Sequence, residues 1–139
     1  MTIPKGKAAE ALYPMLSAFH SISGQSLQAV WQIYTEGSLG TLVLDFGSVS
    51  LIVVADENDD SIDFRIADAT DLRNGVSVDV SHQEPWNSFI GRPFGWGWVT
   101  VNQQGYCDGL LLSFGGIVPQ LVLNVIASSI KVGMITRAS

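Results

Sequence analysis

The sequence has a single cysteine, Cys107, among its 139 residues. One thiol can form neither an intrachain disulfide nor a zinc site made of several cysteines. The fold must therefore rest on a hydrophobic core, and a chain of this length buries roughly two-thirds of its unfolded surface. Because a reducing compartment keeps thiols unpaired, we expect a cytoplasmic protein.

Positive charge is also scarce. The chain has 7 Lys and Arg against 13 Asp and Glu, and only 14% of its residues are charged. Surfaces that bind nucleic acids need clustered lysines and arginines, so we expect no nucleic acid among the partners. Hydrophobic residues make up 47% of the chain, which excludes the composition of a wholly disordered protein.

Long uninterrupted hydrophobic runs are missing. The most apolar region, 117–135, is broken by Pro119, Asn124 and Lys131, and no run reaches the roughly 18–20 residues of a membrane span. Near the N-terminus, Glu10 and Pro14 interrupt the apolar stretch that a secretory signal requires. We therefore expect neither a membrane protein nor a secreted one.

Short segments of alternating polarity are abundant. A helical pattern near 14–23 should end at Gly24, and hydrophobic residues then recur with the period of two that is typical of strands. Eight or nine such segments follow, bounded by turn residues and without helical patterns between them, which favours antiparallel pairing. We predict one α+β, mainly β domain over 1–139. Its antiparallel sheet of about eight strands forms a roll or partial barrel, with one short N-terminal helix.

Negative charge is concentrated in the segment 56–71. This segment holds seven acids and one base, Arg65, so its charge equals the net charge of the chain, −6. Asp56, Asn58 and Asp60 have the spacing of the first ligands of an EF-hand. However, Ser61 replaces the required glycine and Ala67 replaces the bidentate glutamate. We therefore assign neither a metal nor a cofactor to this segment.

Three interpretations of the acidic segment remain open. It is a solvated hairpin turn, in which Asn and Asp are favoured, a looser cation site, or a docking surface for a protein partner with a basic surface. The residues of the acidic surface are Asp56, Glu57, Asp59, Asp60 and Asp63.

Three of the four tryptophans lie in the stretch 85–98. Strand alternation predicts that Phe94, Trp96 and Trp98 share one face, and that Gly95 and Gly97 share the other, where a ring or backbone approaches closely. One interpretation is an aromatic ladder in the core. The other is a surface that binds a sugar, a nucleotide base or a partner's loop, with amides that fix its orientation. The candidate binding residues are Trp86, Trp96, Trp98, Asn102, Gln104, Tyr106 and Asp108.

The run FIGRPFGWGWVTVNQQGYCDGLLLSF at 89–114, followed by a hydrophobic strand and Ala-Ser-Ser-Ile at 127–130, resembles a family of small uncharacterised bacterial domains of unknown function. The resemblance covers roughly residues 40–135. It brings no activity and no catalytic residues. It implies that the hairpin of the family is marked by Gly91, Trp98, Asn102, Gly105, Tyr106, Asp108 and Gly109.

Familiar catalytic motifs are absent. The chain has no P-loop, no dinucleotide-binding glycine fingerprint and no Gly-x-Ser-x-Gly elbow. Cys107 and His82 offer a nucleophile and a base, but the adjacent Asp108 opposes the low thiol pKa that such a nucleophile needs. We therefore assign no catalytic residue.

The sequence favours a non-catalytic module that binds another protein through the acidic segment, the aromatic hairpin or both. By analogy, a small acidic domain that neutralises a basic toxin, an immunity-type protein, has these properties. The alternative is a small-ligand-binding pocket for a sugar or nucleotide, or a small enzyme, lined by Trp86, Trp96, Trp98, Tyr106 and Asp108. A third hypothesis is a homodimer that pairs through an exposed strand edge.

Overall fold

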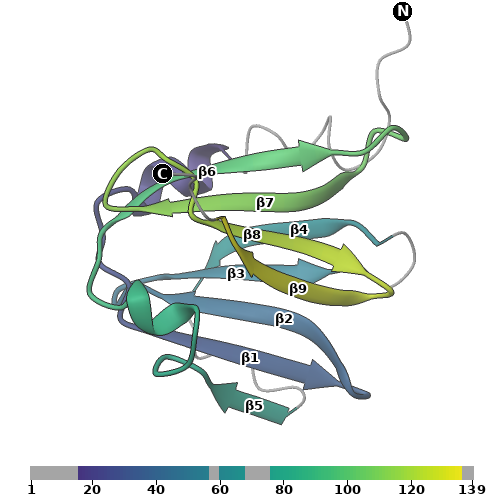
Figure 1. Cartoon of the computed structure of the whole chain (residues 1–139), viewed down its shortest axis with the longest axis horizontal. Helices are drawn as coiled ribbons and strands as arrows, with labels where there is room; N and C mark the ends of the chain where they lie inside the picture. Colours follow the sequence, from purple (N-terminus) through teal and green to yellow (C-terminus); the bar gives the residue numbers. More distant parts are fainter. Residues whose placement is uncertain (1–15, 57–59, 68–75, 136–139) are drawn as a thin grey trace, which may run out of the picture.

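The computed structural model describes residues 16–56, 60–67 and 76–135, and in them nine strands form two antiparallel sheets (Figure 1). The first sheet has the order β4-β3-β2-β1-β5, with β1 (Ala29–Thr35), β2 (Ser38–Asp45), β3 (Ser50–Ala55), β4 (Ile62–Ala67) and β5 (Val76–Asp79). The second has the order β6-β7-β8-β9, with β6 (Phe94–Val101), β7 (Cys107–Phe114), β8 (Leu121–Ile126) and β9 (Ser129–Met134). The predicted mainly β, antiparallel fold is confirmed. The described strands divide between two sheets and form no closed barrel.

One hydrophobic core lies between the two sheets. Strand alternation turns Leu42 and Leu51 of the first sheet, and Leu110, Leu112 and Leu123 of the second, into the same buried cluster. Across this core β9 contacts β2 and β3, while β7 contacts β4. The two sheets therefore pack face to face, which fixes the ends of their strands relative to one another.

The described part of the N-terminal helix spans 16–22 and ends before Gly24, whose φ is 83°. The predicted short helix and its end are thus confirmed, while Pro14 lies outside the described residues. The buried ring of Phe19 stacks on Phe64 of β4 at a centroid distance of 4.8 Å and on Phe94 of β6 at 6.0 Å. The helix therefore covers the core between the edge strands of the two sheets.

A short 3-10 helix, η2 (Trp86–Ser88), lies in the connection between β5 and β6. It inserts the Trp86 ring, which is 1% exposed, into the core. No helix among the described residues has the length and hydropathy needed to cross a membrane.

The predicted alternation of β6 is wrong at its first residues, because a β-bulge shifts the register between Phe94 and Trp96. Phe94 pairs with Phe114 and Gly97 with Leu112, so Phe94 and Gly97 both face the core. Trp98 pairs instead with Leu111 and stands outside the core cluster. An extra residue in one strand reverses the faces that simple alternation assigns.

The predicted close approaches at the two glycines are confirmed. A Cβ on Gly97 would lie 2.4 Å from the Phe19 ring, and a Cβ on Gly95 would overlap the carbonyl oxygen of Gly116. Glycine at these positions lets a ring and a backbone segment reach the strand directly.

Candidate functional site

Two tight hairpin turns shape one end of the molecule. Glu36 and Gly37 join β1 to β2, and Ala127 and Ser128 join β8 to β9, each pair with positive φ at both residues. Such turns match the right-handed twist of the strands that they connect. A bulge at Gly40, between the Ile33–Thr41 and Tyr34–Leu39 pairs, bends β2 just after its turn.

Hydrogen bonds tie these turns to the start of β4. The Asp60 carboxylate accepts a hydrogen bond from the Ser128 backbone N–H at 2.8 Å. Nearby, the Leu39 backbone N–H donates to the Ser129 hydroxyl at 3.1 Å and links the beginnings of β2 and β9. Segments that are far apart in the sequence therefore meet at one end of the two-sheet structure (Figure 1).

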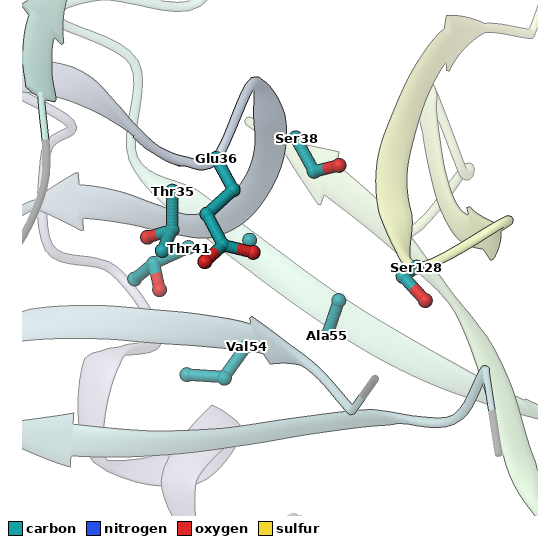
Figure 2. Close-up of a pocket in the computed structure, with 8 residues that line it drawn as sticks. Thr35, Glu36, Ser38, Thr41, Val54, Ala55 and Ser128 are labelled. Carbon is teal, nitrogen blue, oxygen red and sulfur yellow. The ribbon is translucent and has the colours of Figure 1, made fainter. Parts of the chain in front are cut away.

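A groove of about 440 Å³ opens where these turns meet. Figure 2 shows the Glu36 side chain reaching from its turn into the space between Thr41 and Ser128. We call this cavity the turn groove, and its lining residues are Thr35, Glu36, Ser38, Gly40, Thr41, Val54, Ala55 and Ser128.

The turn groove offers one carboxylate and several hydroxyl oxygens as hydrogen-bond acceptors. Four hydroxyl side chains and one carboxylate surround it, over a small apolar floor formed by Val54 and Ala55. No described residue forms an ion pair with Glu36, whose side chain is exposed. The groove therefore offers an unneutralised negative charge beside several hydroxyl oxygens, which suits a cationic hydrogen-bond donor.

Further carboxylates lie at the same end of the molecule as the turn groove. Asp60 is exposed, and so is Asp63, whose carboxylate accepts a hydrogen bond from the Phe64 N–H at 2.9 Å. β7 contacts β4, and both strands begin at this end of the molecule (Figure 1). We define the acidic end as Glu36, Asp56, Asp60, Asp63 and Asp108.

Two of the predicted acidic residues, Glu57 and Asp59, lie outside the described residues. Sequence reasoning missed Glu36, although Thr-Glu-Gly-Ser between two alternating segments is a recognisable two-residue hairpin turn. It also missed the hydroxyls of the turn groove, because three come from the β1–β2 hairpin and the fourth, Ser128, comes from the β8–β9 turn, which only the fold brings beside it.

The aromatic candidates do not gather at one site. Trp86 is buried in the core, Trp96 meets the Phe19 ring edge-on at 5.8 Å, and Trp98 stands outside the core cluster. The turn groove and two further cavities, of about 310 and 350 Å³, are lined by described residues that do not include Trp86, Trp96, Trp98, Asn102, Gln104, Tyr106 or Asp108.

The polar candidates mainly hold the β6–β7 turn in shape. The side-chain oxygen of Asn102 accepts hydrogen bonds from the N–H groups of Gln104 and Tyr106, at 2.9 and 3.1 Å. Asp108 accepts a hydrogen bond from the Thr100 hydroxyl at 2.8 Å. These contacts account for the side chains of Asn102 and Asp108 without a bound ligand, while Gln104 and Tyr106 take part through their backbone N–H groups.

Cys107 is a core residue with no exposed surface. Burial, together with the nearby carboxylates of Asp108 and Asp63, raises the pKa of its thiol to about 12. A nucleophilic cysteine needs the opposite shift, because the thiolate is the reactive form. Among the described residues there is also no cluster of three or more His, Cys, Asp or Glu side chains that would hold a metal ion.

A protein-family model matches residues 13–139, and its description is that of a family of unknown function. The match confirms the resemblance to such a family and extends it beyond residues 40–135, while a bacterial origin stays a prediction. No curated protein and no solved structure matches the chain. The function therefore depends on the chemistry of the site itself.

Proposed function

The chain belongs to DUF6334, a family of unknown function, and we propose from the geometry of the turn groove that it is a non-catalytic module that binds a basic protein. The turn groove carries this proposal, because it combines the Glu36 carboxylate with hydroxyl oxygens. In this proposal the acidic end faces the partner, and the turn groove receives one of its lysine or arginine side chains.

The shape and charge of the site support an arginine or lysine as the inserted residue. A guanidinium presents five N–H donors and no acceptor, and an ammonium presents three donors. Glu36 supplies the opposite charge, and the hydroxyls of Ser38 and Thr41 supply neutral acceptors on the same groove. An anionic ligand would instead meet the repulsion of Glu36 and Asp60.

The segments around the turn groove are held together by hydrogen bonds, which further supports binding of a partner at this groove. The Asp60–Ser128 and Leu39–Ser129 hydrogen bonds connect the segments that line the turn groove. A preorganised groove loses less conformational entropy when a partner binds, so more of the contact energy contributes to affinity. The remaining carboxylates of the acidic end would steer a basic partner toward it over longer distances.

A protein that covers the cationic residues of a basic partner, as an immunity-type protein covers a toxin, is one biological role with this chemistry. In keeping with the single unpaired cysteine, the proposal places this role in the cytoplasm. Genes next to the one that encodes this chain would reveal whether a basic protein is produced with it.

Binding of a fluorescent arginine-rich peptide, followed by anisotropy, tests the proposal. Its citrulline counterpart has the same shape without the charge and serves as the control ligand. We expect the arginine peptide to bind more tightly, and Glu36→Gln to weaken it by about two- to fivefold. Glu84→Gln is the matched control, because Glu84 is an exposed glutamate in the connection before η2 and lies outside the turn groove. Equal binding of both peptides would contradict the proposal.

A further inference from the structure

A second groove, of about 310 Å³, lies where β8 begins and β9 ends. This is the end of the hairpin opposite to the Ala127–Ser128 turn. We call it the Arg92 groove, and its walls include Phe89, Arg92, Val118, Gln120, Met134 and Ile135. It shares no residue with the turn groove.

Exposed hydrophobic side chains gather at the Arg92 groove. Met134 is 54% exposed and Val118 is 45% exposed, and Ile117, next to Val118 in the sequence, is 77% exposed. Isolated exposed hydrophobic residues are common, but several that gather around one concavity mark a binding surface. The volume lies at the lower end of the range of small-molecule sites.

One positive charge stands at this apolar surface. The Arg92 guanidinium lies over the Phe89 ring, 5.8 Å from its centroid, and no described carboxylate pairs with it. The backbone of Arg92 is fixed by its own N–H, which donates to the Phe89 carbonyl at 3.0 Å, and by its carbonyl, which accepts from the Leu27 N–H at 3.0 Å. The backbone of Arg92 is therefore fixed at the groove, and its guanidinium lies over the aromatic face of Phe89.

Gln120 adds donors beside Arg92. Its side-chain oxygen accepts a hydrogen bond from the Phe114 N–H at 2.7 Å, which leaves the two N–H groups of the amide as free donors. Its backbone pairs with Leu112 at 2.9 Å and with Ile135 at 2.9 Å, so the base of the groove is ordered.

From these features we propose that the Arg92 groove binds a small aliphatic carboxylate. The carboxylate accepts hydrogen bonds from the Arg92 guanidinium and the Gln120 amide, which suit a planar anion with two oxygens. The aliphatic chain covers Val118, Met134 and Ile135, whose exposed surface leaves water on binding. A neutral or cationic ligand of the same length lacks the partner for Arg92.

Nuclear magnetic resonance titration with octanoate tests this assignment, with octylamine and butanoate as controls. We expect octanoate to shift the backbone amides of Phe89, Val118, Gln120 and Ile135. Octylamine should bind more weakly because its charge is opposite. Butanoate should also bind more weakly, by up to about fourfold for each methylene that is no longer buried.

Arg92→Gln should weaken octanoate binding by about two- to fivefold, because an ion pair with an exposed guanidinium is lost. Lys131→Gln is the matched control, since Lys131 is an exposed base of β9 outside the groove. Val118→Asp, at an exposed position of the rim, provides a second variant that should weaken octanoate and favour octylamine. The proposal is overturned if octanoate shifts none of these amides, if octylamine binds equally well, or if both Arg92→Gln and Val118→Asp leave octanoate affinity unchanged.

Discussion

The Phe19 ring packs directly against the backbone of Gly97. A Cβ on Gly97 would lie 2.4 Å from Cε1 of Phe19, and the same ring stacks on Phe64 at 4.8 Å. The missing side chain of Gly97 is therefore what lets the N-terminal helix close the core between β4 and β6. This contact joins the helix and both sheets in one packed layer.

Gly97→Ala should destabilise the protein by about 1–3 kcal/mol, because the added methyl group overlaps a ring that other aromatic rings hold in place. Urea unfolding followed by tryptophan fluorescence measures the change. Gly116→Ala is the control, since a Cβ there meets open space, and it should change the free energy of unfolding by less than about 0.5 kcal/mol. Equal effects of the two variants would contradict the packing described for Gly97.

Ser81→Ala should destabilise the protein by about 1–3 kcal/mol. The Ser81 hydroxyl is buried and accepts a hydrogen bond from the Val30 backbone N–H at 2.9 Å. Its removal leaves that N–H without this partner inside the protein. Thermal unfolding measures the loss, and a fully stable Ser81→Ala variant would show that Val30 finds another acceptor.

Because the same hydroxyl also bonds to Asp79, the contribution of Asp79 to the free energy of unfolding depends on pH. Hydrogen bonds from the side chain and the backbone N–H of Ser81 lower the pKa of the Asp79 carboxyl. A lowered folded-state pKa contributes stability above the unfolded pKa of about 3.9, and this stability is lost as the pH falls through the folded value. Asp79→Asn should therefore be less stable than the natural chain at pH 7, and the difference should shrink below about pH 4. A difference that stays constant with pH would refute this linkage.

Cys107 should resist thiol reagents in the folded protein. Its side chain is fully buried, and its pKa of about 12 leaves almost no thiolate at pH 8. Labelling with a chromogenic disulfide reagent should be slow without denaturant and rapid in guanidinium chloride. Fast labelling of the folded chain would mean that Cys107 is reachable, and it would reopen a reactive role for this residue.

Much of the fold follows from local patterns in the sequence. The alternating segments predicted the strands, and Gly24 marked the end of the helix because its φ of 83° suits glycine. The faces of β6 could not be predicted, since the bulge between Phe94 and Trp96 depends on backbone contacts with the 115–116 turn. The division of the strands into two packed sheets also depends on contacts between residues far apart in the sequence, which local patterns do not predict.

The candidate site was predicted only in part. The acidic segment indicated Asp60 and Asp63, because clustered charge is visible in a linear sequence. Glu36 and Ser128 could not be joined to it, since the turn groove exists only where hairpins from both sheets meet. The Arg92 groove was missed for the same reason. Arg92 precedes β6 and Val118 precedes β8, so the fold alone brings them together.

Mapping the residues to which a charged peptide binds shows whether the turn groove receives a cationic side chain. A nuclear magnetic resonance titration with the arginine-rich peptide should shift the amides of Glu36, Ser38, Thr41 and Ser128. These shifts should diminish as salt rises from about 0.1 M to 1 M, because the Debye length falls from about 10 Å to 3 Å. They should also diminish in Glu36→Gln but not in Glu84→Gln. Shifts that appear elsewhere, or that the citrulline peptide reproduces in full, would show that the turn groove does not bind a cationic side chain.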